Sequence, residues 1–321
     1  MRARRLPVTI TVAVLAIAGC SDEAPPAPSP EPNADGWVTR AGAPSARTEV
    51  AAGTLGGRIW VVGGMAESGR PQAEVAIYDP GTDAWSAGPA LPEPVHHAAA
   101  AGDGRRLWVA GGYTGSQNRP TAAVRVIDSA TGTWADGPAL PSPRGAGALA
   151  WDGKRLLFAG GVGQDGLAGD VFALEGGNWR RIGELSPARE HLAAASDGAG
   201  TTWFLAGRLG GLDTNRAEVD VVVGDRVQRA GTVPTARGGV SGFAAPGLGG
   251  CVAGGEQPGG TFDTVECLTA DGRATTLPPL RAGRHGLGAA ALDGVAYVLL
   301  GGPDPGLTVS NTTQALRLSG R

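Results

Sequence analysis

The residues with the greatest capacity for chemistry are grouped near one position that recurs along the chain. All four histidines lie one or two residues after this position, at His96, His97, His191 and His285. Glu49 and Glu190 stand in the same two columns of the repeat. Imidazole and carboxylate groups can bind a polar ligand, exchange protons with a substrate or coordinate a metal ion. These residues are therefore the first candidates for a functional site.

An arginine marks the recurring position in five of six repeats, at Arg47, Arg144, Arg189, Arg237 and Arg284. Val95 takes this place in the second repeat. A tryptophan stands ten residues before the position in four repeats, at Trp37, Trp85, Trp134 and Trp179. We predict structural roles for both sets and expect the arginines to bond loop carbonyls between neighbouring repeats.

Pairs of small residues give a third marker with the same period. They follow apolar runs at Gly63-Gly64, Gly111-Gly112, Gly160-Gly161, Ala206-Gly207, Gly254-Gly255 and Gly301-Gly302. The second residues of these pairs are spaced by 48, 49, 46, 48 and 47 positions. Agreement among three markers indicates a repeat protein in which each unit is one supersecondary structure.

Each unit has the pattern of four short β-strands joined by turns. In the second unit we expect strands at 97–102, 105–110, 124–128 and 133–135, with Asp103-Gly104 as the first turn. Four strands at a period near 48 residues are typical of a propeller blade. The Gly-Gly pair with a later tryptophan resembles the Kelch repeat, of the superfamily that includes galactose oxidase, over residues 37–321. The resemblance implies an all-β, six-bladed Kelch-type β-propeller.

The two ends of this predicted propeller complement each other. The sixth unit lacks a fourth strand, whereas Trp37 to Thr39 forms a strand with no unit before it. We expect this N-terminal strand to join blade 6 and close the ring, which leaves only short, protected sheet edges.

Composition agrees with an all-β domain and argues against nucleic acid as a partner. The chain has 55 glycines and 24 prolines, which suits many turns, and 42% hydrophobic residues, which suffices for a sizeable core. The formal net charge is −3 and the sequence has no basic stripe, so we expect no nucleic-acid ligand. We expect a monomeric domain.

The N-terminal segment resembles an export signal followed by a tether. Residues 1–5 are basic, residues 6–18 are apolar, and Ile17-Ala18-Gly19-Cys20 resembles the bacterial lipobox. This resemblance implies a signal peptide at residues 1–19, lipidation of Cys20, and anchoring to the extracytoplasmic side of the bacterial cell membrane. Residues 20–36 are rich in proline and acidic groups, and we expect them to act as a tether.

The other two cysteines, Cys251 and Cys267, fall in the expected second and third strands of blade 5. A hairpin spans the 16 residues between them, so they could face each other across neighbouring strands. Export would place them in an oxidising compartment, and we predict a Cys251–Cys267 disulfide. The alternative is two buried free thiols.

Propeller topology gathers the candidate residues on one face. The first strand of a blade is innermost and antiparallel to the second, so the start of one and the end of the other share a face. The small residues of the third and fifth repeats are expected to leave space there. The candidate ligand set is Glu49, His96, His97, Tyr113, Glu190, His191, Arg208, Glu256 and His285.

Three interpretations of this face remain open: it binds a polar ligand, it holds a metal ion, or its histidines line a wet channel. The chain has no short metal-ligand spacing such as His-x-His or His-Glu-x-x-His, so we predict no metal and no cofactor. We favour a binding or scaffolding module that recognises a protein, peptide or glycan, and we assign no catalytic residues.

The alternative function is a small-molecule enzyme similar to an exported Kelch mutarotase acting on sialic acid. Acid–base chemistry on a sugar needs a carboxylate or histidine near an arginine, and Glu49, Glu190, His191 and Arg208 could supply these groups. This alternative rests on analogy between folds.

Overall fold

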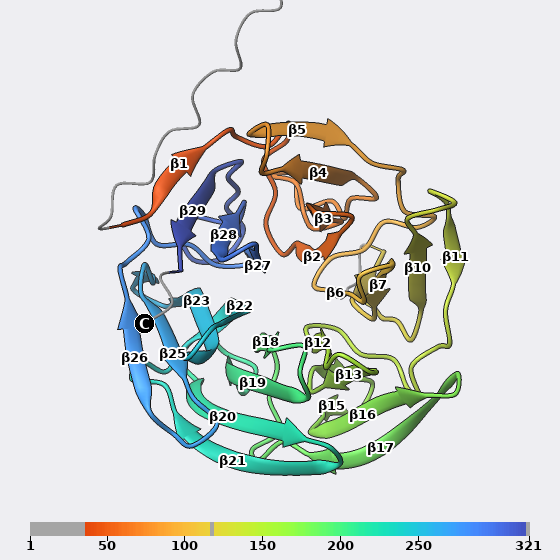
Figure 1. Ribbon diagram of the computed structural model, residues 1–321, viewed down its shortest axis with the longest axis vertical. Coiled ribbons are helices and arrows are strands. Elements are labelled where there is room, and N and C mark those ends of the chain that lie inside the picture. Colours follow the sequence, from red (N-terminus) through yellow and green to blue (C-terminus); the bar gives the residue numbers. More distant parts are fainter. Residues whose placement is uncertain (1–35, 116–118, 319–321) are drawn as a thin grey trace, which may run out of the picture. The chain divides into compact units, whose positions relative to one another are not determined.

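The computed structural model describes residues 36–115 and 119–318, which belong to one compact unit, Glu31–Arg321. The main strands form six β-sheets arranged around a central axis (Figure 1), and two short hairpins form separate two-stranded sheets. The predicted signal peptide, the lipidation site Cys20 and residues 20–35 of the predicted tether lie outside the described residues. No helix in the described ranges is long and apolar enough to span a membrane.

In each of the six sheets four antiparallel strands follow one another outward from the axis. Blade 1 consists of β2 (Ala51–Leu55), β3 (Arg58–Val62), β4 (Val75–Asp79) and β5 (Ala84–Ala87). Blade 2 consists of β6 (Ala99–Gly102), β7 (Arg106–Ala110), β10 (Val124–Asp128) and β11 (Trp134–Asp136). Blade 3 consists of β12 (Ala148–Trp151), β13 (Leu156–Ala159), β16 (Asp170–Glu175) and β17 (Asn178–Glu184).

The second half of the ring repeats this order. Blade 4 consists of β18 (Ala193–Ser196), β19 (Thr201–Arg208), β20 (Asn215–Val223) and β21 (Arg226–Thr232). Blade 5 consists of β22 (Gly238–Ala245), β23 (Gly249–Gln257), β25 (Val265–Leu268) and β26 (Ala274–Leu277). Blade 6 consists of β27 (Gly288–Leu292), β28 (Val295–Leu299), β29 (Thr313–Arg317) and β1 (Val38–Arg40).

Short hairpin strands extend the connection between the second and third strands in three blades. They are β8 (Tyr113–Thr114) and β9 (Arg119–Pro120), β14 (Val162–Gly163) and β15 (Gly166–Leu167), and β24 (Gly260–Thr261).

The predicted ring closure is confirmed. The N-terminal strand β1 pairs antiparallel with β29, with Val38 opposite Ala315 and Arg40 opposite Thr313 (Figure 1). The Trp37 side chain is buried, and its indole N–H donates to the carbonyl of Pro278 at 2.8 Å. Blade 6 is therefore built from both ends of the propeller sequence.

The hydrophobic core of the described residues lies between the blades. Each junction between neighbouring blades holds one cluster of buried apolar side chains. At the junction of blades 1 and 2, for example, Val62, Leu107 and Ile127 are almost completely buried. Burial of this apolar area drives sheet-on-sheet packing around the ring.

The innermost strands contain many alanines and glycines because they approach one another closely at the axis. Gly102 in β6 shows the constraint, since a Cβ atom there would lie 1.8 Å from the carbonyl oxygen of Thr54 in β2. Larger side chains are excluded from such positions by hard-sphere contact.

The predicted disulfide is confirmed. Cys251 in β23 and Cys267 in β25 are direct cross-strand partners and are covalently bonded. The bridge links the second and third strands of blade 5, whose fourth strand has no tryptophan at the marker position.

Several predicted boundaries need correction, and in blade 2 the second and fourth strands each begin one residue later than predicted, as Arg106–Ala110 and Trp134–Asp136. In blade 6 the small pair is Leu300-Gly301 rather than Gly301-Gly302, because Leu300 and Gly301 hold the left-handed φ values, 58° and 91°, that Gly63 and Gly64 hold in blade 1. In blade 2 the first strand begins at Ala99 rather than residue 97, because His97 has a φ of 51° and interrupts the extended backbone.

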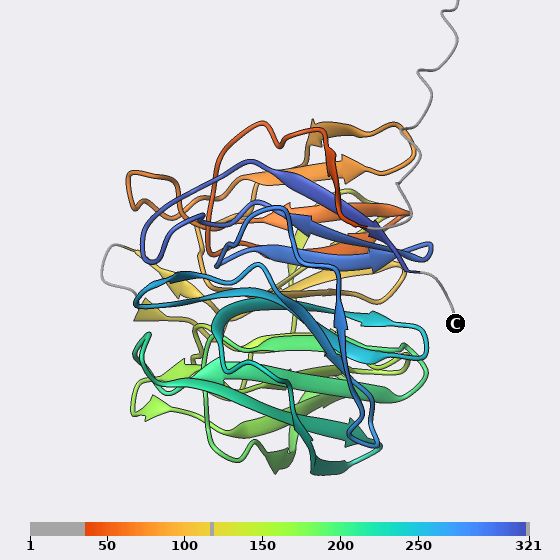
Figure 2. The same cartoon turned by 90° about the vertical axis from the view of Figure 1, so that its left-hand side faces the viewer.

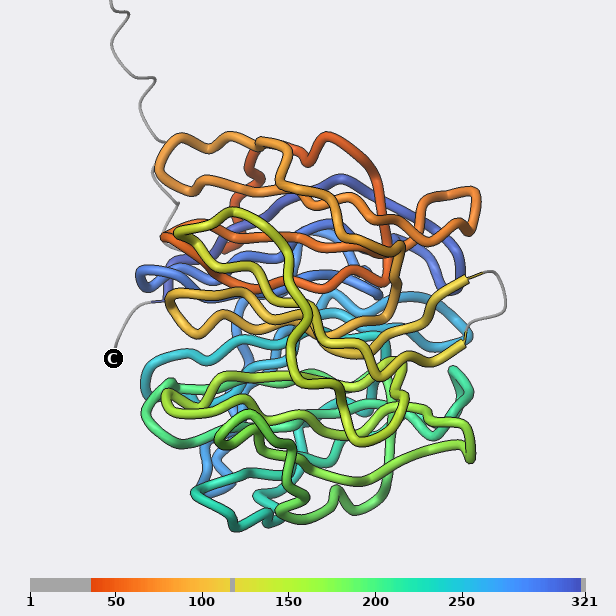
Figure 3. The backbone as a smooth tube through the Cα atoms, turned by 90° about the vertical axis from the view of Figure 1, so that its right-hand side faces the viewer, coloured from red at the N-terminus to blue at the C-terminus, as the bar shows by residue number. Residues whose placement is uncertain are grey.

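The described ends of the chain lie on the face opposite the histidines. We call the face where the first strands begin and the second strands end the histidine face, since His96, His97, His191 and His285 precede first strands. Strand direction alternates within a blade, so β1 begins and β29 ends at the opposite face. Figures 2 and 3 show β1 and the end of β29 on one side of the blades and the β8–β9 hairpin on the other.

Candidate functional site

A ring of left-handed residues surrounds the axis at the histidine face. In every blade the second residue after the arginine marker has a positive φ, between 51° and 72°, at Glu49, His97, Ala146, His191, Gly239 and Gly286. This conformation is uncommon for residues with a Cβ atom and costs roughly 1 kcal/mol or more for each. Two blades use glycine here, whereas three others carry glutamate or histidine.

Main-chain hydrogen bonds connect this ring from blade to blade. In blades 2 to 6 the N–H of the ring residue donates to the carbonyl of the ring residue in the preceding blade. His97 donates to Glu49 at 3.0 Å, and the series continues from Ala146 to Gly286. The last contact, from Val50 N–H to the carbonyl of Gly286 at 3.2 Å, closes the circle. The side chains at the ring are therefore held by a backbone with little freedom to move.

The first residue after each marker forms a second, outer layer. It pairs through an antiparallel bridge with the residue that follows the small pair, as in His96 with Tyr113 and Glu190 with Arg208. The predicted candidates Tyr113, Arg208 and Glu256 thus lie beside the histidine columns, although they are 16 or more residues away in sequence.

Small residues in blades 3 and 5 allow larger neighbours to fold over them. A Cβ atom on Gly145 would lie 2.3 Å from the ring of Tyr113, and one on Gly238 would lie 3.0 Å from Arg208 Cδ. The space that we expected these blades to leave is therefore occupied by Tyr113 and Arg208.

Eight of the nine predicted ligand residues form one connected group that we call the axial cluster. Its members are Glu49, His96, His97, Glu190, His191, Arg208, Glu256 and His285. The ninth residue, Tyr113, packs against it with ring centroids 5.5 Å from those of His96 and His97.

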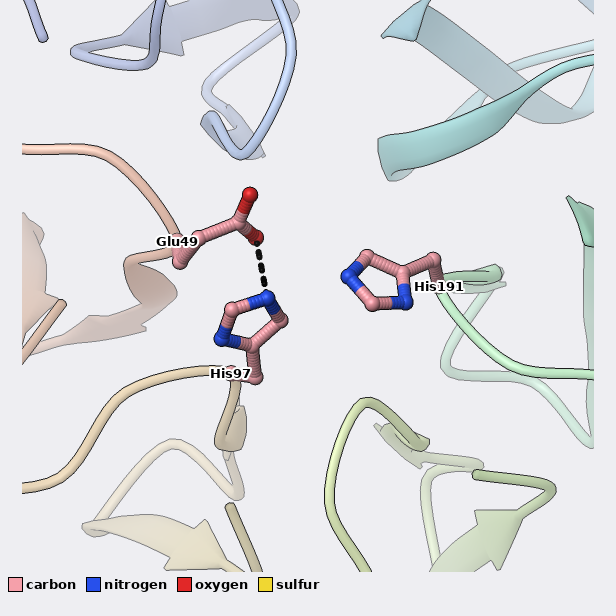
Figure 4. A group of neighbouring side chains, drawn as sticks. All are labelled: Glu49, His97 and His191. Atoms are coloured by element: carbon pink, nitrogen blue, oxygen red, sulfur yellow. Dashed lines mark ion pairs between the residues drawn. The ribbon is translucent and has the colours of Figure 1, made fainter. Parts of the chain in front are cut away.

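Glu49 joins two histidines in this cluster. Its Oε2 lies 3.2 Å from His97 Nε2 (Figure 4), and its Oε1 lies 3.2 Å from His285 Nδ1. His285 Nδ1 is also 3.7 Å from Glu256 Oε2, and His97 Nδ1 is 2.5 Å from His96 Nδ1. The glutamate of blade 1 thus connects groups from blades 2 and 6.

Arg208 joins the other half of the cluster. Its Nε donates to Glu190 Oε1 and its Nη1 donates to Glu256 Oε1, both at 2.8 Å. Its Nη2 lies 2.9 Å from His191 Nε2, and His191 Nδ1 contacts the second oxygen of Glu190. All of these residues are buried or nearly so, which strengthens their mutual attraction relative to exposed pairs.

Burial and neighbouring charges set the protonation of the Glu49 half. Burial lowers the pKa of the His97 imidazole to about 3, although the charge of Glu49 opposes this shift. Burial alone would raise the pKa of the Glu49 carboxyl, but His97 and His285 outweigh it and hold that pKa well below its usual range. Burial would likewise lower the pKa of His285, yet the hydrogen bond and charge of Glu49 raise it.

In the Arg208 half, neighbouring charges favour the ionised form of Glu190. Burial acts to raise the pKa of Glu190, but His191 and Arg208 lower it overall. Burial raises the pKa of the nearby Tyr113 to about 12, so its hydroxyl stays protonated and can donate a hydrogen bond. The axial cluster and Tyr113 therefore offer carboxyl, imidazole, guanidinium and phenol groups within one small region.

The open space at this point is small. A cavity of about 60 Å³ is lined by Glu49, His97, His191 and their neighbours. Along the axis a second cavity of about 100 Å³ is lined mainly by small inner-strand residues such as Ala51 and Ala99. The first volume is large enough for water or an ion, whereas pockets for drug-sized ligands measure roughly 300–1,000 Å³.

The marker arginines lie beneath this face and contact their own blades. The guanidinium groups of Arg47, Arg189 and Arg237 are buried and donate to carbonyls of the same blade, such as Gly63 and Ala206. Contact between blades comes instead from the marker's main-chain carbonyl, which accepts from the small pair of the preceding blade, as in Gly112 N–H to Arg144. The expected contact of these side chains between blades is therefore corrected.

Sequence reasoning missed the acidic partners of these arginines. Arg144 pairs with Asp170 at 3.0 Å, Arg189 with Asp220 at 2.7 Å, and Arg237 with Glu266. A signal was present, because in each of these blades an acidic residue near the third strand follows the arginine by roughly 30 positions.

The four marker tryptophans connect neighbouring blades at the periphery. The indole N–H of Trp85 donates to the Ala41 carbonyl, and those of Trp134 and Trp179 donate to Pro89 and Pro138, all at 2.8 Å. Each acceptor belongs to the link that leads into the blade carrying the tryptophan, as Pro278 does for Trp37.

Comparisons with known proteins agree with this architecture. A family model for the Kelch motif matches residues 46–92 and 94–141, which span blades 1 and 2. The solved structure of YjhT is similar with a TM-score of 0.71 at 14% sequence identity, covering 86% of this chain and 96% of that chain. A search of curated proteins found no match to the chain. The chain is a six-bladed β-propeller that carries Kelch motifs, and at this identity the likeness to YjhT extends to the fold alone.

Proposed function

We propose that this propeller is an extracytoplasmic, lipid-anchored binding module that recognises a protein, peptide or glycan through its histidine face. The observation that carries the proposal is the axial cluster, in which ionisable side chains from blades 1, 2, 4, 5 and 6 converge at one end of the axis. Such a convergence of donors and acceptors suits recognition of polar groups.

The size of the cavity favours binding at the surface of this face over enclosure of a substrate. The space of about 60 Å³ beside Glu49 and His191 is far below that of an ordinary small-molecule pocket. Arg208, Glu190 and Glu256 satisfy one another, which gives a rigid polar platform. A ligand that covers the mouth of the axis would contact several blades at once.

The position of the chain ends supports the anchoring part of the proposal. β1 starts on the face opposite the histidines, so a tether leading to it would attach the propeller by its far side. The Cys251–Cys267 disulfide agrees with export, since such bonds persist mainly in oxidising compartments. The lipidation of Cys20 rests on the lipobox resemblance alone.

The binding proposal is tested by probing peptide and glycan arrays with the purified protein and with a Glu190→Gln/His191→Ala variant. Removing these two groups disrupts the polar platform, and we expect affinity for the wild-type ligand to fall about tenfold or more. The matched control is Arg226→Ala/Asp271→Asn, which alters two exposed residues at the opposite face. Full binding by the Glu190/His191 variant would place the ligand site elsewhere.

The anchoring proposal is tested by fractionating bacterial cells that express the protein or a Cys20→Ala variant. We expect the wild type in the membrane fraction and the variant in the soluble exported fraction, because the variant has no thiol to receive the lipid. Equal membrane association of both proteins would reject lipidation at this residue.

A sugar-converting enzyme is the second candidate, favoured by one observation. Glu190, His191 and Arg208 contact one another, and an acid–base group beside an arginine suits proton transfer on a sugar. Mutarotation of a panel of free sugars, including sialic acid, followed by NMR tests it. Rates equal to the uncatalysed reaction would exclude this candidate and leave the binding proposal intact.

A further inference from the structure

Three side chains from three blades meet at the axis with their polar atoms close together. Glu49 of blade 1, His97 of blade 2 and His191 of blade 4 each place a ligand atom within 4.8 Å of the other two. Figure 4 shows the carboxylate and both imidazole rings directed toward a shared space. Two imidazoles and one carboxylate form a donor set that zinc and related divalent ions bind in proteins.

We propose that Glu49, His97 and His191 form a binding site for a divalent transition-metal ion, with zinc as the reference ion. The three ligands would occupy one side of the ion, and a position toward the histidine face would remain for water or a donor atom from another molecule. Because the ligands come from different blades, they need none of the short spacings by which metal sites are sought in sequences.

The spacing of the first two ligands already suits a metal ion. Glu49 Oε2 lies 3.2 Å from His97 Nε2. Two atoms about 2.0–2.1 Å from zinc lie about 3.3 Å apart at a tetrahedral angle. The ligand atoms of all three residues lie within 4.8 Å of one another, so binding of the ion requires His191 to move closer to the other two ligands.

Groups behind the ligands orient both imidazoles. Glu190 contacts Nδ1 of His191, and His96 Nδ1 lies 2.5 Å from Nδ1 of His97. Metal-binding histidines commonly use their second ring nitrogen in such a contact, which directs the other nitrogen toward the ion. Arg208 Nη2 lies 2.9 Å from His191 Nε2. When the metal binds this nitrogen, Arg208 would lose that contact and keep its hydrogen bonds with Glu190 and Glu256.

The charge and the backbone conformation of these residues also favour a cation site. Among the described residues of the axial cluster, three carboxylates face a single guanidinium, that of Arg208, so a divalent cation offsets an excess of negative charge. Each proposed ligand also holds a left-handed φ of 51° or 52°, at positions where blades 5 and 6 use glycine. Strain in residues that converge on one point is typical of a functional site.

A second group, formed by Glu49, Glu256 and His285, has a similar compactness. Its imidazole nitrogen Nδ1 lies 3.2 Å from Glu49, within hydrogen-bond distance, and 3.7 Å from Glu256, so a proton on that nitrogen is bound by Glu49 and lies close to the carboxylate of Glu256. The first group has its imidazole edges directed to a common point, and for this reason we assign the ion to it.

The experiment titrates chelator-treated, dialysed protein with zinc chloride by calorimetry and with cobalt(II) by visible absorption. We expect one ion per chain and the intense cobalt bands of a low-symmetry, four- or five-coordinate site. His97→Ala, His191→Ala and Glu49→Gln should each weaken zinc binding about tenfold or more, because each removes a ligand. Glu67→Gln, which removes an exposed carboxylate from a loop of the same face, should keep wild-type affinity.

Folding is controlled by measuring the melting temperature of each variant without metal. Where an alanine variant does not fold, the glutamine variant of the same residue is titrated in its place. The ion is also located from the anomalous zinc peak in crystals of the wild-type protein grown with zinc. Absence of stoichiometric binding, or wild-type affinity in folded His97 and His191 variants, would overturn the site. If His285→Gln loses zinc binding while His191→Ala keeps it, the ion belongs to the second group and the proposed site is also overturned. No macromolecular ligand is used, so the outcome is independent of the proposed function.

Discussion

Buried arginines at the start of the blades combine large desolvation costs with specific partners. Arg237 is fully buried, donates to the carbonyl of Thr264 at 2.8 Å and pairs with Glu266 at 2.5 Å. Burial lowers the pKa of its guanidinium, with Glu266 acting in the opposite direction. Removing one partner of such a pair leaves a buried charge without compensation, which is more costly than losing the pair as a whole.

We therefore predict that Arg237→Met destabilises the protein by about 3–5 kcal/mol. A Glu266→Gln change added to it should restore part of this loss, because it removes the buried negative charge that has lost its arginine partner. Urea denaturation of the two variants measures both effects.

The matched control is Arg58→Met, which breaks an ion pair whose side chains are 54% and 30% exposed. Exposed pairs contribute about 1 kcal/mol or less, so this variant should stay close to wild type. Equal losses for Arg58 and Arg237 variants would show that burial does not decide the role of the marker arginines.

At the scale of elements, the first turn of blade 2 depends on an aspartate. Asp103 Oδ1 accepts from the N–H groups of Arg105 and Arg106, and its Oδ2 accepts from the Trp108 indole at 2.9 Å. Burial acts to raise the pKa of this carboxyl, but the hydrogen bonds from Trp108 and the main chain lower it overall. The turn is thus held by the ionised form.

Because the pKa is lower in the folded state, the stabilisation is present above the unfolded pKa of about 3.9 and is lost as the pH falls through the folded value. We predict that Asp103→Asn costs about 1–2 kcal/mol at pH 7 and progressively less at pH values below about 3.9. Urea midpoints across this pH range measure the difference. Glu93→Gln, at an exposed position, is the control for loss of a carboxylate. A cost for Asp103→Asn that does not vary with pH would contradict the role of the charge.

At the scale of the whole molecule, the ring depends on one short strand. β1 supplies the outer edge of blade 6 and places Trp37 in the core cluster between blades 5 and 6. Its loss would expose the edge of β29 and leave that junction without its largest side chain.

We predict that deleting residues 36–41 lowers the melting temperature by about 10 °C or more, as expected for loss of a buried tryptophan and a strand. Differential scanning calorimetry of the deletion and of a control that lacks residues 26–31 measures this effect. The control shortens the predicted tether by the same length and should melt like the wild type. An unchanged melting temperature for the first deletion would mean that the ring does not need closure.

Much of the fold was predictable because a propeller repeats a local pattern. Strand alternation, turns and the small pairs act within one unit of 46 to 49 residues, so their period gives the number of blades and the partner of β1. The Cys251–Cys267 bridge was predictable for the same reason, since both residues belong to neighbouring strands of one blade. The position of the small pair in blade 6 was not, because glycine at residues 301 and 302 conceals which backbone is left-handed.

The sequence by itself thus determined the blades, the closing strand and the face on which the histidines gather. Only the tertiary structure decided which of these side chains touch, because Glu49, His97 and His191 are brought together by ring closure across blades 1, 2 and 4. It also decided that Tyr113 and Arg208 fold over Gly145 and Gly238, into space that we expected blades 3 and 5 to leave open. Contacts of this kind depend on packing between distant segments, which no local period encodes.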